Sequence, residues 1–145
     1  MDLDLTVNLS DLIRIVLAGV IALPVALERE KENQIMGLRT FPLVAVAACS
    51  YVLLTRTVIV ESSDAIARVV QGLITGIGFI GGGAILKKDD DGLVQGTATA
   101  ASIWTTGAVG AAVAFGRIDI AIIISLITYA ILRLFAPLKD RVGPD

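Results

Sequence analysis

The sequence predicts an all-α membrane protein, a polytopic bundle of about five helices that cross a lipid bilayer. Hydrophobic residues occupy 55% of the 145 positions and charged residues only 18%, whereas soluble domains average roughly 45–50% and about 25%. Two stretches, 69–86 and 93–115, contain no charged residue over 18 and 23 positions. A spanning helix needs about 20 mostly apolar residues, so both stretches are long enough to cross.

Five apolar segments are expected to span the membrane, and together they form a single transmembrane domain over residues 1–145. Their approximate limits are 12–27, 41–58, 68–86, 93–115 and 118–136. The third and fourth are apolar on every side, which suits lipid or a packed bundle and not a soluble surface. The others are shorter, and the second could lie in the membrane interface instead, which would leave four spans.

The distribution of charge around these segments predicts the topology. Acidic residues precede the first segment where a cleaved signal peptide needs positive charge, so this segment is expected to remain in the mature protein. Lys and Arg accumulate in cytoplasmic loops. An outside N-terminus puts eight basic residues in the cytoplasm: Arg29, Lys31, Arg39, Lys87, Lys88, Arg133, Lys139 and Arg141. It leaves four outside: Arg14, Arg56, Arg68 and Arg117. We therefore expect the N-terminus outside and the C-terminus in the cytoplasm of a plasma (inner) membrane protein.

Composition argues against several classes of function. The chain has no histidine and a single cysteine, Cys49, so it lacks the usual base at neutral pH and the commonest zinc ligand. We expect no enzyme activity, no cofactor and no metal site. The net charge of −2 provides no basic surface for nucleic acid. Carboxylates fall at the ends of the apolar segments, which counts against a simple ion pump.

Two motifs resemble known sites without their context. Gly76, Gly78 and Gly81 have the spacing of a dinucleotide-binding loop, but that loop must follow a strand and open a helix. The acidic run at 89–91 resembles a calcium loop, but Lys87 and Ala98 would occupy ligand positions where an EF-hand needs carboxylates. We interpret the first as helix packing and the second as a solvated loop.

Glycines dominate the third segment and suggest close helix packing. Gly72 and Gly76 are four residues apart, as are Gly78 and Gly82, which allows another helix of the same or a second chain to approach. Leu at Gly76 or Gly78 should then disrupt assembly more than Leu at Val69. Alternatively, the glycines at 81–83 break the helix and line a cavity. Trp104, in the middle of the fourth segment, is expected to pack against glycines and not to form a ligand platform.

Charged residues border the first two segments across one loop. Glu28 follows the first segment and Arg39 precedes the second. Isolated charge is costly at the edge of a membrane, so pairing is favoured. We expect Glu28 and Arg39 to form an ion pair that closes the cytoplasmic mouth of the bundle; the alternative is separate anchoring at the lipid headgroups.

Four blocks resemble the membrane domain of the MgtC/SapB family. They are Leu-Glu-Arg-Glu at 27–30, Gly-Leu-Arg-Thr at 37–40, the glycine-rich block at 76–85 and the block at 96–104 that ends in Trp104. Their order and spacing match from about Leu12 to Gly116, as a short form without the C-terminal cytosolic domain of longer members. The resemblance nominates these functional candidates: Glu28, Arg29, Glu30, Gly37, Arg39, Thr40, Gly76, Gly78, Gly81, Thr99 and Trp104.

The resemblance implies a small non-enzymatic regulator of other membrane proteins, the F-type ATP synthase among them, linked to adaptation to low magnesium. Its partners would be the lipid bilayer and other membrane proteins, with a homo-oligomer left open. The alternative is a transporter or channel for Mg²⁺ or another small solute. This chain departs from the family at Ala22 and Ala26, where glycines are usual, at Phe41, often His, and at Ala98, usually Asn or Thr.

Overall fold

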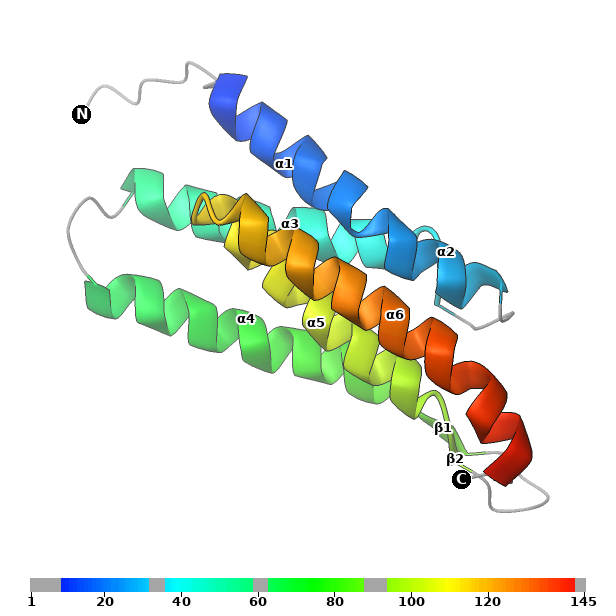
Figure 1. The fold of residues 1–145 in the computed structure, drawn as a ribbon. Helices are drawn as coiled ribbons and strands as arrows, with labels where there is room; N and C mark the ends of the chain where they lie inside the picture. The colour runs from blue at the N-terminus through cyan, green and yellow to red at the C-terminus, as the bar shows by residue number, and fades with distance from the viewer. Residues whose placement is uncertain (1–8, 32–35, 59–62, 88–93, 143–145) are drawn as a thin grey trace.

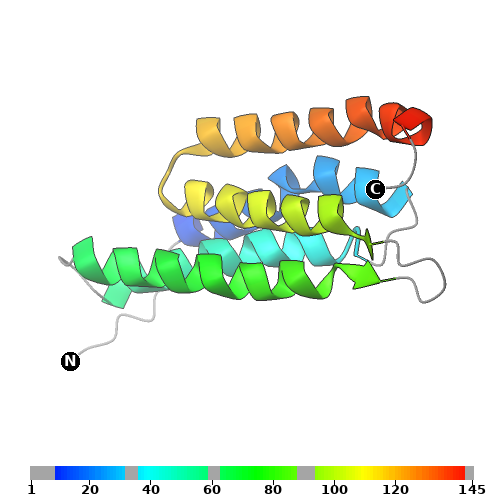
Figure 2. The ribbon, with the colours of Figure 1, turned by 90° about the horizontal axis from the view of Figure 1, so that it is seen from below.

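A computed structural model describes residues 9–31, 36–58, 63–87 and 94–142, and these ranges form six helices and two short strands. In chain order the elements are α1 Leu9–Ile21, α2 Leu23–Lys31, α3 Thr40–Val58, α4 Ser63–Gly83, β1 Leu86–Lys87, β2 Val94–Gln95, α5 Thr97–Ala114 and α6 Ile118–Val142. The helices lie side by side as one elongated bundle (Figures 1 and 2). The predicted all-α bundle is confirmed.

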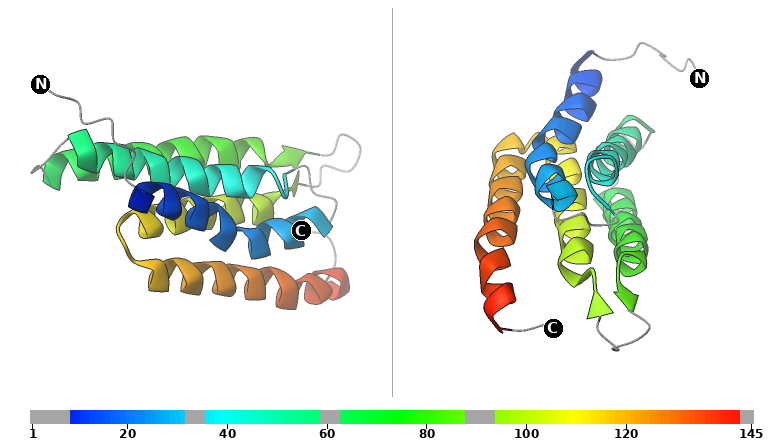
Figure 3. Two further views of the ribbon diagram at one scale, coloured as in Figure 1. Left: turned by 90° about the horizontal axis from the view of Figure 1, so that it is seen from above. Right: turned by 90° about the vertical axis from the view of Figure 1, so that its right-hand side faces the viewer.

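The helix α5 occupies the centre of the bundle. It is the principal neighbour of α3, α4 and α6 and also contacts α1, and Figure 3 shows it enclosed by them. Its buried side chains meet those of α3 in a core that includes Cys49, Val52, Val109 and Val113. Segment 41–58, for which a position in the membrane interface was the alternative, therefore forms α3 and packs one face into the core of the bundle.

Three helical stretches within the described ranges are long and apolar enough to cross a membrane: Leu9–Lys31, Asp64–Gly83 and Ile118–Pro137. Thr40–Arg56 is a shorter apolar helix. The helix α5 is not among these three and carries the hydroxyl groups of several Thr and Ser residues. Hydroxyls of α5 bond carbonyl groups of the same helix; that of Ser102 donates to the Ala98 carbonyl at 2.8 Å, for example.

The first apolar segment bends where proline interrupts it. Pro24 cannot donate to the carbonyl four residues earlier, and its ring clashes with that carbonyl. The helix accordingly divides into α1 and α2 around Ala22. Ser125 of α6 donates a hydrogen bond to the carbonyl oxygen of Ile21 at 2.6 Å. A neighbouring helix thus provides a hydrogen-bond donor for a backbone carbonyl group at the bend.

The glycines of the i, i+4 pairs differ in their surroundings. Gly78 lies beside Trp104, whereas a Cβ at Gly72 or Gly76 would meet nothing within 4 Å in the part of the chain that the structure describes. A Cβ at Gly110 would instead overlap the Ala45 carbonyl of α3, and one at Gly107 would overlap Ile77 of α4. The closest backbone packing therefore involves glycines of α5, because α5 has neighbours on several sides.

The helices of the third and fourth apolar segments have other limits than expected: α4 ends at Gly83 and not at 86, and α5 begins at Thr97 and not at 93. Gly81, Gly82 and Gly83 form the last turn of α4 and end it, and do not interrupt a span. Residues 86, 94 and 95 were expected to be helical, but residues 86–87 and 94–95 form an antiparallel pair of strands with Leu86 opposite Gln95. The chain turns between α4 and α5. Gly96 is suited to this turn for two reasons: its φ of 92° is rarely adopted by other residues, and a Cβ there would overlap the Ala84 carbonyl.

Candidate functional site

The candidate residues come from four element ends that meet at one end of the bundle (Figure 1). These ends are the last turns of α2, the start of α3, the last turns of α4 and the first half of α5. We call this the Glu28 end. The opposite end, where α1 begins and α5 ends, is called the Arg14 end. The described carboxylates and guanidinium groups lie towards these two ends of the helices.

Glu28 is a buried charged group at the Glu28 end. Its side chain is only 6% exposed, and its Oε1 accepts a hydrogen bond from Arg133 Nη1 of α6 at 3.5 Å. In the part of the chain that the structure describes, Glu28 Oε2 has no hydrogen-bond partner. The Arg133 side chain is 58% exposed, so the pair joins a buried carboxylate to a cation at the surface of the bundle.

The predicted ion pair between Glu28 and Arg39 is wrong. Arg39 is exposed before the start of α3, whereas Glu28 faces α6 and pairs with Arg133. The prediction rested on the short separation of Glu28 and Arg39 along the chain, which does not show which way α2 faces. The bend at Ala22 turns α2 towards α6, and its partner is 105 residues away along the chain.

Glu30, and not Glu28, joins the two charged blocks across the loop. Its Oε2 accepts the backbone N–H of Leu38 at 2.9 Å. A Cβ at Gly37 would overlap this carboxylate and lie 3.1 Å from Glu30 Cα. The close approach therefore requires glycine at position 37. The Glu30 carboxylate thereby fixes the entry into α3, whose first turn follows with Phe41 N–H bonded to the Gly37 carbonyl at 3.3 Å.

Arg29 and Phe41 are buried beside these contacts. Arg29 is 4% exposed although it neighbours the exposed Glu30 and Lys31. Phe41, where the family often has His, is fully buried and packs in the same apolar cluster as Val25 and Ala26 of α2. Thr40 is half-buried at the first position of α3. These side chains hold the end of α2 against the start of α3.

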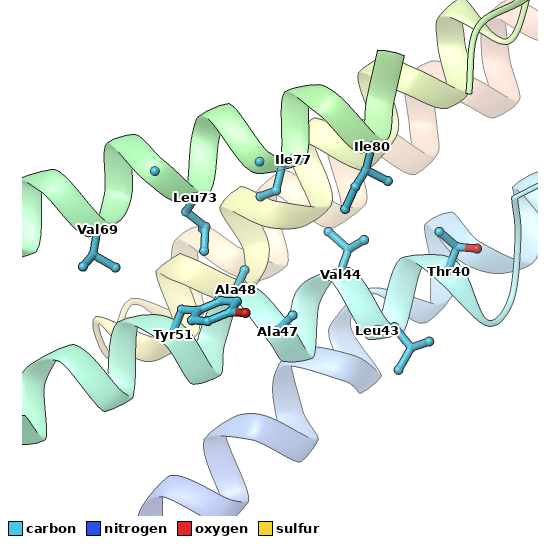
Figure 4. Close-up of a pocket in the computed structure, with 12 residues that line it drawn as sticks. Thr40, Leu43, Val44, Ala47, Ala48, Tyr51, Val69, Leu73, Ile77 and Ile80 are labelled. Atoms are coloured by element: carbon cyan, nitrogen blue, oxygen red, sulfur yellow. The ribbon is translucent and has the colours of Figure 1, made fainter. Parts of the chain in front are cut away.

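The candidates on α4 and α5 face one another. Gly78 lies under Trp104, whose Nε1 would be 3.7 Å from a Cβ at that position, and Gly81 lies against the Ala100 backbone. Trp104 contacts a glycine as expected, but it is 53% exposed and so lies at the outside of the bundle. Thr99 is buried. Gly76 does not join them and lines a groove between α3 and α4 (Figure 4).

At the Arg14 end, two guanidinium groups converge on one carbonyl. Arg14 Nη1 of α1 and Arg56 Nη1 of α3 both donate to the Ala114 oxygen, at 3.3 and 2.9 Å. Ala114 is the last residue of α5, where carbonyl groups lack partners within the helix and cations are favoured. Arg14, which interrupts the first apolar segment, therefore ties α1 and α3 to the end of the central helix.

Sequence reasoning missed Arg133, Ser125 and Gly110. Arg133 follows an uncharged run and Ser125 lies within it. The sequence shows that both are polar, but it does not show that Ser125 bonds α1 and that Arg133 bonds α2. Gly110 belongs to a stripe of small residues with no stronger signature than Gly76. Among the described residues, no three His, Cys, Asp or Glu side chains come together as a metal site. The arrangement holds helices together and presents charge at one end.

Comparison with known proteins identifies the family. The sequence model of the MgtC family matches residues 15–141. The chain belongs to the MgtC family. Among related proteins, SrpB of Synechococcus elongatus is 33% identical over 136 residues, which cover 87% of this chain and 75% of SrpB. No solved structure matches the chain.

Two other MgtC-family relatives are longer than the aligned region. YhiD of Escherichia coli, whose name proposes a role in magnesium transport, is 29% identical over 90% of this chain and 63% of its own length. MgtC of Brucella abortus is 36% identical over 79% of this chain and 46% of its own. The chain thus spans about half of that protein. Family membership and the three apolar stretches make this MgtC-family chain a membrane protein.

Proposed function

We propose that the chain is a non-enzymatic regulator of other membrane proteins, linked to adaptation to low magnesium, and that it crosses the plasma (inner) membrane five times with its C-terminus in the cytoplasm. The observation that carries the proposal is the closed, closely packed interior around α5. Ile103, Val109 and Val113 of α5 are at most 2% exposed, and the buried hydroxyls of Ser102 and Thr106 bond carbonyl groups of α5 itself. A solute pathway needs polar groups or irregular backbone that line a cavity at membrane depth, whereas this interior suits a rigid body that acts by contact.

The Glu28 end supplies the surface for such contact. The loop that Glu30 fixes to Leu38 presents Arg39 to the outside of the bundle, and Arg133 is exposed on the adjacent α6. Exposed cations beside a backbone that is fixed by the Glu30–Leu38 bond are suited to recognise acidic groups of another protein, because little conformational entropy is lost on binding. We include the F-type ATP synthase among the candidate partners, on the family resemblance.

Copurification and a functional assay test the proposal together. The chain is expressed with a C-terminal tag in Escherichia coli, extracted in mild detergent and purified, and co-purifying membrane proteins are identified. ATP-driven proton pumping is then measured in inverted membrane vesicles with and without the chain. A regulator of the ATP synthase should co-purify with it and lower pumping, and Arg39→Gln should weaken both effects. Purification of the chain alone, with unchanged pumping, would reject this partner.

Transport is the second candidate, and Glu28 is the observation that favours it. A buried carboxylate with one oxygen unbonded in the described part of the chain is the kind of group that cation carriers use, and the name of YhiD points to magnesium. Purified chain in liposomes that contain a Mg²⁺-sensitive dye tests this directly. Flux that Glu28→Gln abolishes and Asp119→Asn preserves would favour a transporter over the regulator.

A further inference from the structure

An apolar groove runs along the outside of the bundle between α3 and α4. It has a volume of about 760 Å³, and Figure 4 shows Val44, Ala47 and Tyr51 of α3 facing Leu73 and Ile77 of α4. Apart from the hydroxyl groups of Thr40 and Tyr51, every lining side chain is apolar or absent. The complete lining is Thr40, Leu43, Val44, Ala47, Ala48, Tyr51, Val69, Gly72, Leu73, Gly76, Ile77 and Ile80.

The length and depth of the groove match one leaflet of the bilayer. Along α3 it extends from Thr40, the first residue of the helix, to Tyr51, which is about 17 Å at 1.5 Å per residue. Half of the hydrocarbon core of a bilayer is about 15 Å. With Thr40 at the level of the headgroups, the groove would end near the middle of the membrane.

The charge beside the groove complements a phospholipid. Arg39 immediately precedes Thr40 and is exposed, and Lys31 at the end of α2 is exposed at the same end of the bundle. A guanidinium group binds a phosphate through paired hydrogen bonds. The apolar groove is one leaflet long and has a cation at its headgroup end. It therefore complements a phospholipid, whose acyl chain would lie in the groove and whose phosphate would lie beside the cation.

The walls fit a flexible chain better than a second helix. Gly72 and Gly76 have space above them, but Leu43 and Tyr51 on the opposite wall are 66% and 60% exposed. These two large side chains would hold a helix backbone away from the glycines, whereas close helix packing in membranes needs small residues on the surfaces in contact. We propose that the groove binds an acyl chain of an anionic phospholipid whose phosphate is held by Arg39.

Photolabelling in nanodiscs tests the proposal. The chain is reconstituted in phosphatidylethanolamine and phosphatidylglycerol with a trace of phosphatidylglycerol that carries a diazirine in its acyl chain. After irradiation, adducts are located by mass spectrometry of peptides. We expect adducts concentrated on residues 69–80 of α4 and 43–51 of α3. Equal labelling of the groove and of the outer face of α6 at Ile123 and Leu126 would mean bulk lipid only and would overturn the proposal.

Two glycines on the same helix provide a matched pair of variants. Gly76→Phe fills the groove, whereas Gly82→Phe adds the same side chain outside it, and a Cβ meets nothing within 4 Å at either position. Groove labelling should fall about tenfold in Gly76→Phe and stay unchanged in Gly82→Phe, which is a binding difference of about 1.4 kcal/mol. Equal labelling of both variants would contradict the proposal, and the map of the unsubstituted chain remains decisive if either variant does not fold.

The headgroup and the competing occupant are tested separately. Arg39→Gln should remove the preference for the phosphatidylglycerol probe over a phosphatidylcholine probe with the same acyl chain; a retained preference would exclude Arg39 as the phosphate ligand. Ala47→Cys, in a chain with Cys49→Ala, places a thiol in the groove. A disulfide between two copies through this thiol at native expression levels would assign the groove to a second chain instead and overturn the lipid site.

Discussion

The hydroxyl of Ser125 on α6 donates to the carbonyl oxygen of Ile21 at 2.6 Å, at the bend between α1 and α2. This contact joins residues 104 positions apart, and Ser125 is only 2% exposed. A backbone carbonyl inside a membrane bundle has no water to bond if its partner is removed. This bond therefore contributes to the orientation of α2 and to the position of Glu28, together with the packing of α2 against α3 and α6.

Ser125→Ala should lower the stability of the bundle. Loss of one partner of a buried hydrogen bond costs about 1–3 kcal/mol, and we expect a lower unfolding temperature in detergent. Thr75→Val is the matched control, because the exposed Thr75 hydroxyl bonds Gln71 within its own helix. An equal effect of the two substitutions would show that the Ser125 contact does not hold the bend.

Glu28 and Arg133 should behave as an energetically coupled pair. Arg133 is more than half exposed, so we expect a coupling near the range of surface pairs, about 1 kcal/mol, with the larger loss from Arg133→Gln because it leaves a buried carboxylate alone. Glu28→Gln combined with Arg133→Gln should be no worse than Arg133→Gln. Unfolding of the four proteins in detergent gives the coupling.

Glu28→Gln combined with Arg39→Gln is the control for that cycle. The structure separates Glu28 from Arg39, so their effects should add to within about 0.5 kcal/mol. Coupling in this second cycle and none in the first would restore the pair expected from the sequence.

Gly110→Ala should destabilise the bundle more than Gly76→Ala. A methyl group at Gly110 overlaps the Ala45 carbonyl and the Ala48 Cβ, whereas at Gly76 it meets nothing. Overpacking of this kind costs about 1–3 kcal/mol, while alanine in an open helical position is at most about 1 kcal/mol more favourable than glycine. Unfolding temperatures in the same detergent compare them. A larger loss for Gly76→Ala would mean that α4 packs on another chain through this position.

Gly37 and Glu30 should respond to substitution as parts of one turn. Gly37→Ala places a methyl group against the Glu30 carboxylate, and Glu30→Ala removes the acceptor for the Leu38 N–H. We expect each to cost about 1–2 kcal/mol, whereas Glu30→Gln keeps an oxygen acceptor and should cost less. Hydrogen exchange at Leu38 is the direct measurement: it should accelerate in Glu30→Ala. Unchanged exchange there would show that the carboxylate does not protect this amide.

Thiol labelling tests the proposed topology. In a Cys49→Ala background, Asp145→Cys should react only with a membrane-permeant maleimide in intact cells, because the basic residues favour a cytoplasmic C-terminus. Arg117→Cys, at the Arg14 end, should react with an impermeant reagent. The reverse pattern would invert the topology, and the same pattern at both sites would mean that α6 does not cross the membrane.

The local features of this fold were accessible from the sequence, and the long-range ones were not. Segment positions and the all-α class follow from hydrophobicity, which is read along the chain. The pairing of Glu28 with Arg133 and of Ser125 with Ile21 depends on which helices are neighbours and on their rotation. Pro24 indicated a bend, but nothing near it indicated that the bend turns α2 towards α6. Glycine spacing likewise indicated Gly76, which faces the groove, and missed Gly110, which is enclosed.

The central position of α5 has a consequence for how the protein is made. Proteins are synthesised from the N-terminus, so α1 to α4 leave the ribosome before the helix that fills the space among them. Until α5 arrives, α4 lacks its principal neighbour and α3 exposes Ala45 and Ala48. The main contacts among the early helices are then those of α3 with α1, α2 and α4. We therefore expect the bundle to close only after the fourth apolar segment has entered.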